Sequence, residues 1–320
     1  MGDRTLEDGN KGRISVVLIA GPTASGKSRL ALQLAERHGG TIVNVDSLQV
    51  YQDLSILTAR PTTQDEAKAP HRLYGYLSAR EPMSAGRFLR DVAPILDDCR
   101  ASGSPAILCG GTGLYFKALL GLLDEMPDIP GDLRAKWRQR LAELGSQALH
   151  ETLRTIDPAS ATRLDPADGQ RIARALEVSD ATGQPFSSFQ RRLGPALVDP
   201  NRSVKIVLAP DRALLRQRIA ERFDIMLEQG AFGQVAAFLD LHGNIDGGPT
   251  KAIGFRELAD VHLDRIDLRT ARERAIIRTR QYAKRQETWF RHQFNESWTR
   301  LTDPGQISEL DIARKLDSTG

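Results

Sequence analysis

Short apolar runs alternate with helically spaced apolar residues over the first 120 positions of the chain. The runs predict strands at residues 13–20, 41–46 and 105–109, and the helical spacing predicts helices at about 27–38, 84–101 and 112–120. A later run at 204–209 predicts another strand of the same sheet, followed by an arginine-rich helix. Strands that alternate with helices are typical of a parallel sheet covered on both faces, so we expect an α/β core.

The pattern changes between residues 121 and 200. This segment has no strong strand signal, and prolines separate short helical stretches at about 132–144, 146–155 and 169–182. We therefore expect a mostly helical insertion domain at 121–200, mounted on a core formed by 13–120 and 201–320. Residues 1–12 read as a flexible N-terminal tail, and the segment after Leu301 as loop with a short helix.

Composition narrows the class of protein only a little. The 320 residues are 40% hydrophobic and 27% charged, as in ordinary globular proteins, and no apolar run approaches the length of about 20 residues that spans a membrane. The polar N-terminus lacks the apolar segment of a signal peptide. The two cysteines, Cys99 and Cys109, fit neither a disulfide framework nor a metal site, so we expect a cytoplasmic protein without membrane contact.

A phosphate-binding loop is the strongest motif. The signature G-x-x-x-x-G-K-[ST] is matched at every fixed position by Gly21-Pro22-Thr23-Ala24-Ser25-Gly26-Lys27-Ser28, between a predicted strand and a predicted helix. Such a loop lets the backbone approach phosphate oxygens, and the helix N-terminus offers N–H groups to an anion. Lys27 is expected to neutralise a phosphate and Ser28 to hold Mg²⁺. The motif predicts binding of a di- or triphosphate, ATP included, without identifying which.

Two further segments follow predicted strands. Asp46 ends the second one, where ligands of parallel sheets bind; its carboxylate could coordinate Mg²⁺, act as a general base, or only cap the next helix. The segment Cys109–Tyr115 holds three glycines within four residues, which would allow a ligand to approach the backbone, and Thr112 offers a hydroxyl at its tip. In many phosphate-loop hydrolases a strand like 105–109 ends in a Mg²⁺-binding Asp. This chain has no Asp at that place, which argues against an ATPase.

Arginine-rich helices give weaker signals. Arg218 and Arg222 lie four apart on one helix face and could clamp phosphates, or could simply face water. In the insertion, the positions of Arg171 and Arg174 predict a charged helix but no particular function.

The segment 272–292 carries seven basic and two acidic residues, with Tyr282, Trp289 and Phe290 interleaved. This pattern is typical of RNA binding through backbone charge and base stacking. The alternative is a solvated helix whose aromatic side chains lie in the core.

Taken together, the motifs resemble the tRNA dimethylallyltransferase (tRNA isopentenyltransferase) family over roughly residues 14–300. The matching blocks, in the family's order, are GPTASGKS, DSLQVY from Asp46, GGTGLYF from Gly110, QRIARALEV from Gln170, RFDIML from Arg222, KAIGFREL from Lys251 and TRQYAKRQETWF from Thr279. The resemblance implies a P-loop NTPase-like parallel sheet with a helical insertion that contacts tRNA. It also implies transfer of a dimethylallyl group from dimethylallyl diphosphate to N6 of the adenine next to the anticodon, with Mg²⁺. Leu57 stands where the family commonly carries Gly.

The resemblance also implies roles for individual residues. The phosphate loop, Gly21 to Ser28, would hold the diphosphate leaving group, with Thr23 close to it, Arg222 on its other side and the metal at Ser28. Asp46 would accept a proton from the adenine amino group or orient it. The implied catalytic residues are Asp46, Thr112 and Arg222. The implied contacts to the tRNA anticodon stem-loop are Asp46, Ser47, Leu48, Gln49, Thr112, Arg134, Gln170, Arg171, Ile172, Ala173, Arg174, Arg280, Lys284 and Arg285. The family suggests a monomer.

Two other functions remain open from the residues alone. A phosphate-loop kinase that phosphorylates a small acceptor would explain Lys27, Ser28, Asp46 and Arg222 equally well, but neither GGTGLYF nor the basic aromatic helix. A nucleotide-gated RNA-binding module without catalysis would leave Asp46 without a role.

Overall fold

The structure, a computed structural model, describes residues 16–190, 193–243 and 245–305. The expected N-terminal tail and most of the segment after Leu301 lie outside these residues. The chain divides into two compact units: a core unit of residues 1–120 and 197–320, and an insertion unit of residues 121–196. The second boundary lies a few residues before the one expected from the sequence, because the N–H groups of Leu197 and Val198 both bond to the carbonyl of Leu119 in the core unit.

The core unit is built on one six-stranded sheet, and the expectation of a parallel sheet is confirmed. The strand order is β3-β2-β4-β1-β5-β6, with parallel pairing between all neighbours. The strands are β1 Val16–Ala20, β2 Thr41–Asn44, β3 His71–Arg72, β4 Ala106–Gly110, β5 Ser203–Leu208 and β6 Thr299–Leu301. The sequence predicted four of them; β3 and β6 are too short to carry a pattern of their own.

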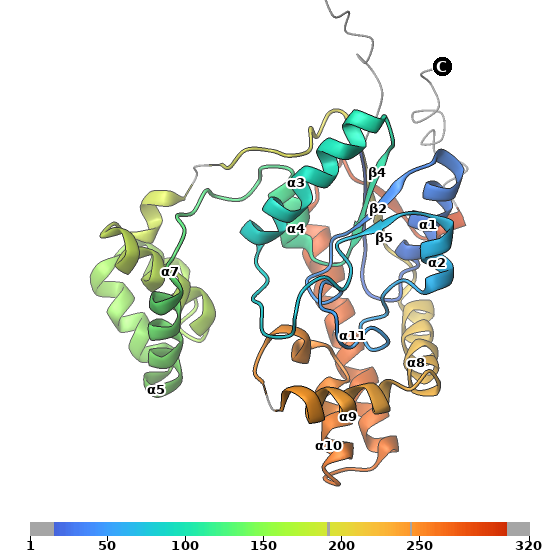
Figure 1. Ribbon diagram of the computed structural model, residues 1–320. Coiled ribbons are helices and arrows are strands. Elements are labelled where there is room, and N and C mark those ends of the chain that lie inside the picture. Colours follow the sequence, from blue (N-terminus) through green and yellow to red (C-terminus); the bar gives the residue numbers. More distant parts are fainter. Residues whose placement is uncertain (1–15, 191–192, 244, 306–320) are drawn as a thin grey trace, which may run out of the picture. The chain divides into compact units, whose positions relative to one another are not determined.

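Helices cover both faces of this sheet, as Figure 1 shows. On one face, Val17 and Ile19 of β1 pack with α1, Lys27–His38, while α2, Thr63–Lys68, lies beside α1. On the other face, Leu18 of β1 packs with α3, Ala85–Ser102, and α4, Gly113–Leu119. Side chains that alternate along a strand therefore enter two separate cores, which explains why the strands are apolar throughout.

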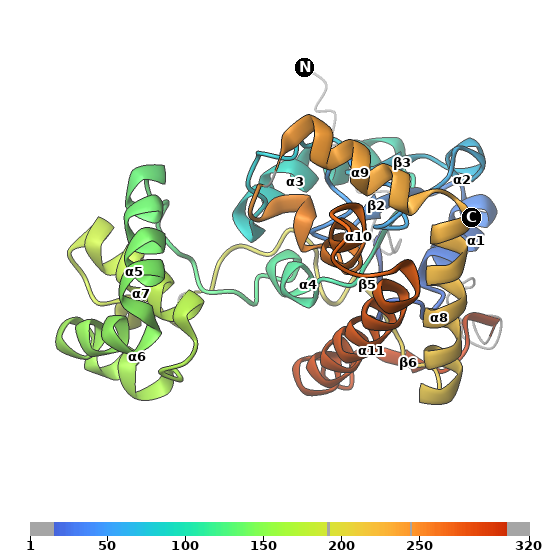
Figure 2. The ribbon, with the colours of Figure 1, turned by 90° about the horizontal axis from the view of Figure 1, so that it is seen from below.

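A helical subdomain completes the core unit (Figures 1 and 2). Its helices are α8 Arg212–Glu228, α9 Ala231–His242, α10 Phe255–His262 and α11 Leu268–Gln293, with a short 3₁₀ turn, η2, at Gly248–Lys251. They share a core with Leu54 and Leu57 from the segment after β2. In Figure 2, α8 and α11 lie side by side. The expectation that the chain is mostly helical after residue 211 is confirmed for the described residues.

The insertion unit is helical, as the sequence predicted. Its elements are α5 Gly131–Ile156, α6 Pro158–Arg163, α7 Gly169–Thr182 and a 3₁₀ turn, η1, at Phe186–Phe189. Gly145 breaks α5 into two helical pieces, because its φ of 77° is left-handed. Trp137, Leu153 and Leu176 belong to a separate small core. Across residues 16–190, 193–243 and 245–305, no helix has the length and apolar character needed to cross a membrane.

Candidate active site

The phosphate loop lies where the sequence placed it, between β1 and α1. Gly26 precedes the helix with a φ of 91°, and Ala24 also has a positive φ of 62°. These conformations turn the chain tightly, and the Ser25 N–H donates to the Pro22 carbonyl at 3.3 Å. The Lys27 ammonium folds back onto the same loop and donates to the Pro22 carbonyl at 3.2 Å. The loop thus has the strand–loop–helix form of an anion-binding site.

A cavity of about 290 Å³ adjoins this loop. Its polar wall comes from the phosphate loop, the segment after β2, α8 and α11. The polar lining residues include Thr23, Lys27, Ser28, Asp46, Gln49, Arg222, Thr279, Tyr282 and Gln286, and the apolar ones include Leu48, Leu57, Ile219, Phe223, Met226 and Ile253. The cavity is therefore charged beside the phosphate loop and lined by aliphatic and aromatic side chains elsewhere.

Asp46 lies in a turn rather than at a helix start. Its Oδ1 accepts the N–H of Leu48 at 2.9 Å, which is an Asx-turn, and the next helix begins only at Thr63. The helix-capping interpretation of Asp46 is therefore wrong. Its Oδ2 accepts no hydrogen bond from the part of the chain that the structure describes, and the side chain lines the cavity. One carboxylate oxygen remains for a substrate or a metal ion.

The two arginines predicted on α8 have different surroundings. Arg222 Nη1 donates to the Thr23 hydroxyl at 3.2 Å and lines the cavity. Arg218 is not part of the cavity lining. Of the two, it is therefore Arg222 that belongs to the site, facing the phosphate loop from α8.

The cavity holds more positive than negative charge. Burial lowers the pKa of the Lys27 ammonium, and nearby Arg222 lowers it further, while the Asp46 carboxylate acts in the opposite direction. Burial also lowers the pKa of Arg222, against the effect of Asp46. Two cations gathered around one carboxylate in a partly buried site favour an anionic ligand that would neutralise them.

The glycines at the end of β4 and in the loop after it have a different purpose from the one expected. A Cβ on Gly110 would lie 2.0 Å from the Val45 carbonyl oxygen, and one on Gly113 would lie 2.1 Å from the ring of Trp289. On Gly111 it would lie 2.4 Å from Gln286 Nε2. The chain's own atoms therefore fill the space that the sequence suggested for a ligand, and Gly111 and Gly113 allow α11 to pack onto this loop.

Thr112 holds the Asp46 segment in place. Its Oγ1 accepts the Ser47 N–H at 3.1 Å, and its own N–H donates to the Val45 carbonyl at 3.2 Å. Neither Thr112 nor Ser47 lines the cavity, whereas their neighbours Asp46, Leu48 and Gln49 do. Thr112 therefore acts on the site through the backbone of Ser47.

Gln286, a neutral residue within the basic helix, carries no motif that would mark it in the sequence. It is 7% exposed, and its side chain joins two loops. Oε1 accepts the Thr23 N–H at 2.9 Å, and Nε2 donates to the Gly111 carbonyl at 2.9 Å. Its role could not be read from local pattern because it depends on contacts 175 and 263 residues away in sequence.

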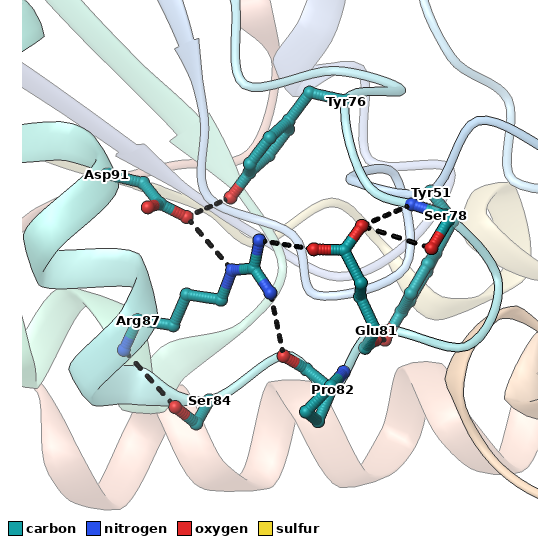
Figure 3. Close-up of polar contacts among 8 residues, drawn as sticks. All are labelled: Tyr51, Tyr76, Ser78, Glu81, Pro82, Ser84, Arg87 and Asp91. Carbon is teal, nitrogen blue, oxygen red and sulfur yellow. Dashed lines mark hydrogen bonds and ion pairs between the residues drawn. The ribbon is translucent and has the colours of Figure 1, made fainter.

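A polar network supports the segment after Asp46 (Figure 3). Residues 49–52 pair with 75–77, and the Tyr51 hydroxyl donates to the Glu81 carbonyl at 3.2 Å. The Glu81 carboxylate accepts from the N–H and hydroxyl of Ser78 and from Arg87 Nη2 at 2.8 Å. These bonds lower the pKa of Glu81 to about 2. The network fixes the outer end of the loop that carries Asp46.

The cations of the basic helix α11 have different surroundings and therefore different roles. Arg272 pairs with Asp224 and Arg278 with Glu257, so both stabilise contacts between helices. Phe290 is buried in the core, so the stacking role expected for it is wrong, while the partly buried Trp289 packs against the same core. Tyr282 lines the cavity, with the Arg285 guanidinium 5.8 Å from its ring centre.

Four further cations border a groove of about 380 Å³ between α8 and α11. Arg280 and Lys284 line it from α11, and Arg212 and Arg216 line it from α8. Arg212 is paired with Glu287 at 3.3 Å. The other three have no ion-pair partner among the described residues, so the groove can receive anionic groups.

In the insertion unit, the expected RNA contacts divide into exposed and buried positions. Gln170 and Arg171 are exposed, while Arg174 is partly exposed and pairs with Glu177 at 3.2 Å. Ile172 and Ala173 are buried in the small core, so their side chains support α7 instead of facing solvent.

Arg134 is partly buried in the same unit, and its Nε has no hydrogen-bond partner in the described structure.

Both cysteines are buried and free. Burial raises the pKa of the Cys109 thiol to about 12, so it is neutral at physiological pH. Among the described residues no group of three His, Cys, Asp or Glu side chains could hold a metal ion.

The fold and the site define a phosphate-loop α/β protein with a cationic, partly apolar cavity and a helical insertion. A model of the IPP transferase family matches residues 49–293. The tRNA dimethylallyltransferase of Agrobacterium fabrum is 48% identical over 285 residues, which cover 89% of this chain and 96% of that protein. The chain belongs to the IPP transferase family.

Solved structures agree with this assignment. The full-length tRNA isopentenylpyrophosphate transferase of Bacillus halodurans is 31% identical, with a TM-score of 0.67, over 96% of this chain and 98% of that one. A eukaryotic dimethylallyltransferase, described as acting on tRNA, is 27% identical with a TM-score of 0.78, over 95% of this chain and 77% of that one.

Proposed function

We propose that this protein transfers the dimethylallyl group of dimethylallyl diphosphate to N6 of the adenosine at position 37 of tRNA, giving N6-(dimethylallyl)adenosine and diphosphate. The observation that carries the proposal is the two-part cavity. Lys27 and Arg222 provide positive charge beside the phosphate loop, and Leu57, Phe223 and Met226 provide apolar wall. An allylic diphosphate has the same division between a charged head and a small apolar tail.

The leaving group determines the chemistry beside the phosphate loop. The bond between C1 of the allyl group and its oxygen breaks, and the diphosphate departs with the electron pair. Lys27, Arg222 and the loop N–H groups stabilise the negative charge that grows on that oxygen. The Thr23 N–H is already donated to Gln286, so Thr23 contributes its hydroxyl rather than its backbone.

Asp46 acts on the acceptor. The adenine amino group is a poor nucleophile because its lone pair is delocalised into the ring. As N6 forms its bond to C1, it must lose a proton, and the free Oδ2 of Asp46 is the carboxylate oxygen in the cavity that can accept it. The Asx-turn and the Thr112–Ser47 bond hold the segment before substrate arrives. The base must leave its stack to enter such a cavity, which favours a single-stranded loop as substrate.

Mg²⁺ fits this donor set. It is usually bound by one or two protein oxygens, with phosphates and water completing the octahedron. The exposed Ser28 lines the cavity beside the phosphate loop, and its hydroxyl offers an oxygen of that kind. When bound, the metal would neutralise charge on the diphosphate.

We assign tRNA binding to polar and charged residues of both units. In the core unit Arg280 and Lys284 border the α8–α11 groove, and Arg285 lies at the surface of the same helix. In the insertion unit Arg134, Gln170, Arg171 and Arg174 are the candidates, because Ile172 and Ala173 are buried. The protein is proposed to act as a cytoplasmic monomer.

A phosphate-loop kinase is the competing function, and the family membership does not support it. The two functions separate in one experiment, in which the protein is incubated with tRNA and either dimethylallyl diphosphate or ATP. We expect a tRNA heavier by one prenyl group with the allylic diphosphate and no change with ATP. Unmodified tRNA in both reactions, or a phosphorylated product with ATP, would contradict the proposal.

A further inference from the structure

Gln286 of α11 connects two loops that border the cavity. Its Oε1 accepts the N–H of Thr23 in the phosphate loop, and its Nε2 donates to the carbonyl of Gly111 in the loop after β4, both at 2.9 Å. The side chain is 7% exposed, and both of its polar ends are used. A neutral amide that bridges two backbone groups fixes their separation without adding charge to the site.

The bridge continues on both sides. The Thr23 hydroxyl accepts from Arg222 Nη1, so a chain of hydrogen bonds runs from α8 through the phosphate loop to α11. On the other side, a Cβ on Gly111 would lie 2.4 Å from Gln286 Nε2 and 3.4 Å from Asp46 Oδ2. Gly111 therefore lies close to both the amide and the free oxygen of the proposed base.

We propose that Gln286 is a positioning residue, which sets the phosphate loop and the loop after β4 at the separation that the reaction requires. The inference rests on the proposed function, since it assigns diphosphate to one of these loops and the acceptor to the neighbourhood of the other. A small displacement of reacting groups lowers a rate strongly, so a rigid bridge has a direct kinetic consequence.

The location of Gln286 distinguishes this role from RNA binding. Its sequence neighbours Lys284 and Arg285 are exposed, while its own side chain is buried. The bridge needs one hydrogen-bond acceptor and one hydrogen-bond donor at the end of the same side chain. Glutamine meets that need at every pH, and a glutamic acid of the same length meets it only when protonated.

Two variants test the proposal, Gln286→Met and Gln286→Glu. Methionine has a similar length and no hydrogen bonds, so we expect kcat to fall about tenfold or more, with tRNA affinity unchanged. Four groups of the cavity lining would surround the carboxyl introduced by Gln286→Glu. Asp46 would raise the pKa of that carboxyl, Lys27 and Arg222 would lower it, and the fourth group is the Tyr282 hydroxyl. We expect the activity of Gln286→Glu, relative to wild type at each pH, to recover as pH falls and the introduced carboxyl takes up a proton.

Gln293→Glu provides the control. Gln293 is exposed at the end of the same helix, so its variant should keep the wild-type pH profile. Melting temperatures on the same samples test for loss of folding. A flat activity ratio for Gln286→Glu across pH, or wild-type kcat in Gln286→Met, would overturn the positioning role.

Binding of inorganic diphosphate tests the role of Gln286 independently of the proposed function, because this binding requires no catalysis. Calorimetry should show about tenfold weaker diphosphate binding by Gln286→Met than by wild type. If the wild type binds diphosphate but transfers no prenyl group, the proposed function fails while the bridge is still tested by this comparison. Equal affinities in the two proteins would overturn the bridge alone.

Discussion

Arg278 of α11 forms an ion pair with Glu257 of α10, and the Glu257 side chain is only 5% exposed. Glu257 also accepts the Gly254 N–H at 3.1 Å, which caps α10. One arginine of the most basic helix of the chain therefore neutralises a buried carboxylate. Charge counted along the sequence overstates what this helix can offer to RNA.

The pair predicts a stability effect for Arg278→Ala. Loss of the guanidinium leaves Glu257 buried without its cation, which costs about 1–3 kcal/mol of unfolding free energy. We expect a lower melting temperature and a tRNA affinity within a few-fold of wild type at a temperature where both proteins are folded. A large loss of tRNA affinity with an unchanged melting curve would instead make Arg278 an RNA contact.

Arg280→Ala combined with Lys284→Ala should give the opposite result. Both residues border the α8–α11 groove. If each neutralises one phosphate, the slope of log affinity against log salt should flatten by roughly 0.7–0.9 per contact. tRNA affinity at three salt concentrations, with a melting curve on the same samples, measures this. Diphosphate binding should not change.

The matched control for this pair is Arg274→Ala combined with Arg291→Ala, which removes the same charge from exposed positions of the same helix outside the groove. The two double variants should differ in salt slope. If both flatten the slope equally, the helix acts only through its net charge, and the groove has no specific role.

Asp46→Asn should act on the chemical step. Asparagine can keep the Asx-turn to Leu48 but cannot accept the proton. We expect kcat to fall by about 10²–10⁴, the range of general-base catalysis, with tRNA affinity within a few-fold of wild type. Single-turnover rates at saturating substrates measure this. Asp53→Asn, a carboxylate of the following segment that does not line the cavity, is the control. A wild-type rate for Asp46→Asn would remove Asp46 from the mechanism.

The sequence could predict what depends on local pattern. The helix expected at 27–38 forms at Lys27–His38, and the strand and loop before it lie where the motif placed them. The same holds for α7 at Gly169–Thr182. In each case the spacing of apolar residues and a loop or capping residue determine the element within a few residues of chain.

What the sequence could not predict depends on contacts between distant segments. Gln286 and Arg278 belong to one basic stretch, yet one joins two active-site loops and the other neutralises a buried carboxylate. The three glycines at positions 110, 111 and 113 suggested a ligand, but their space is filled by Val45, Gln286 and Trp289. Only the packing of α11 against the loops decides between these roles.

The Glu81–Arg87 network predicts a loss of stability in acid. The pKa of Glu81 is lowered from 4.5 to about 2 by its hydrogen bonds to Ser78 and Arg87. A carboxylate with a depressed pKa in the folded state contributes its stabilisation above the unfolded value and loses it as pH falls. Melting temperature should therefore decline between pH 4.5 and about 2, and less steeply in Glu81→Gln. Parallel decline in both proteins would assign the acid sensitivity to other carboxylates.

Lys27→Met should separate ligand binding from stability. Burial is the main cause of the lowered pKa of Lys27, so its charged form is disfavoured in the folded, ligand-free protein. Between the pKa of Lys27 in the folded protein and 10.5, the unfolded chain binds more protons than the folded one, so the contribution of Lys27 to the free energy of unfolding rises with pH. Below that range Lys27 is charged in both states, and the full destabilisation from burying its charge is present. At about pH 7.5 the ligand-free variant should therefore melt higher than wild type, with an advantage that shrinks as pH approaches 10.5.

Function should change in the opposite direction. Without the ammonium, charge on the departing diphosphate loses a partner that matters most in the transition state, so kcat should fall by about 10²–10³ and KM for dimethylallyl diphosphate should rise. Added diphosphate should raise the melting temperature of wild type and not of Lys27→Met. Arg29→Met, which replaces an exposed cation two residues away on α1, should show neither effect. A Lys27→Met protein that melts lower than wild type at that same pH, yet is still stabilised by diphosphate, would show that Lys27 supports the fold rather than the anion.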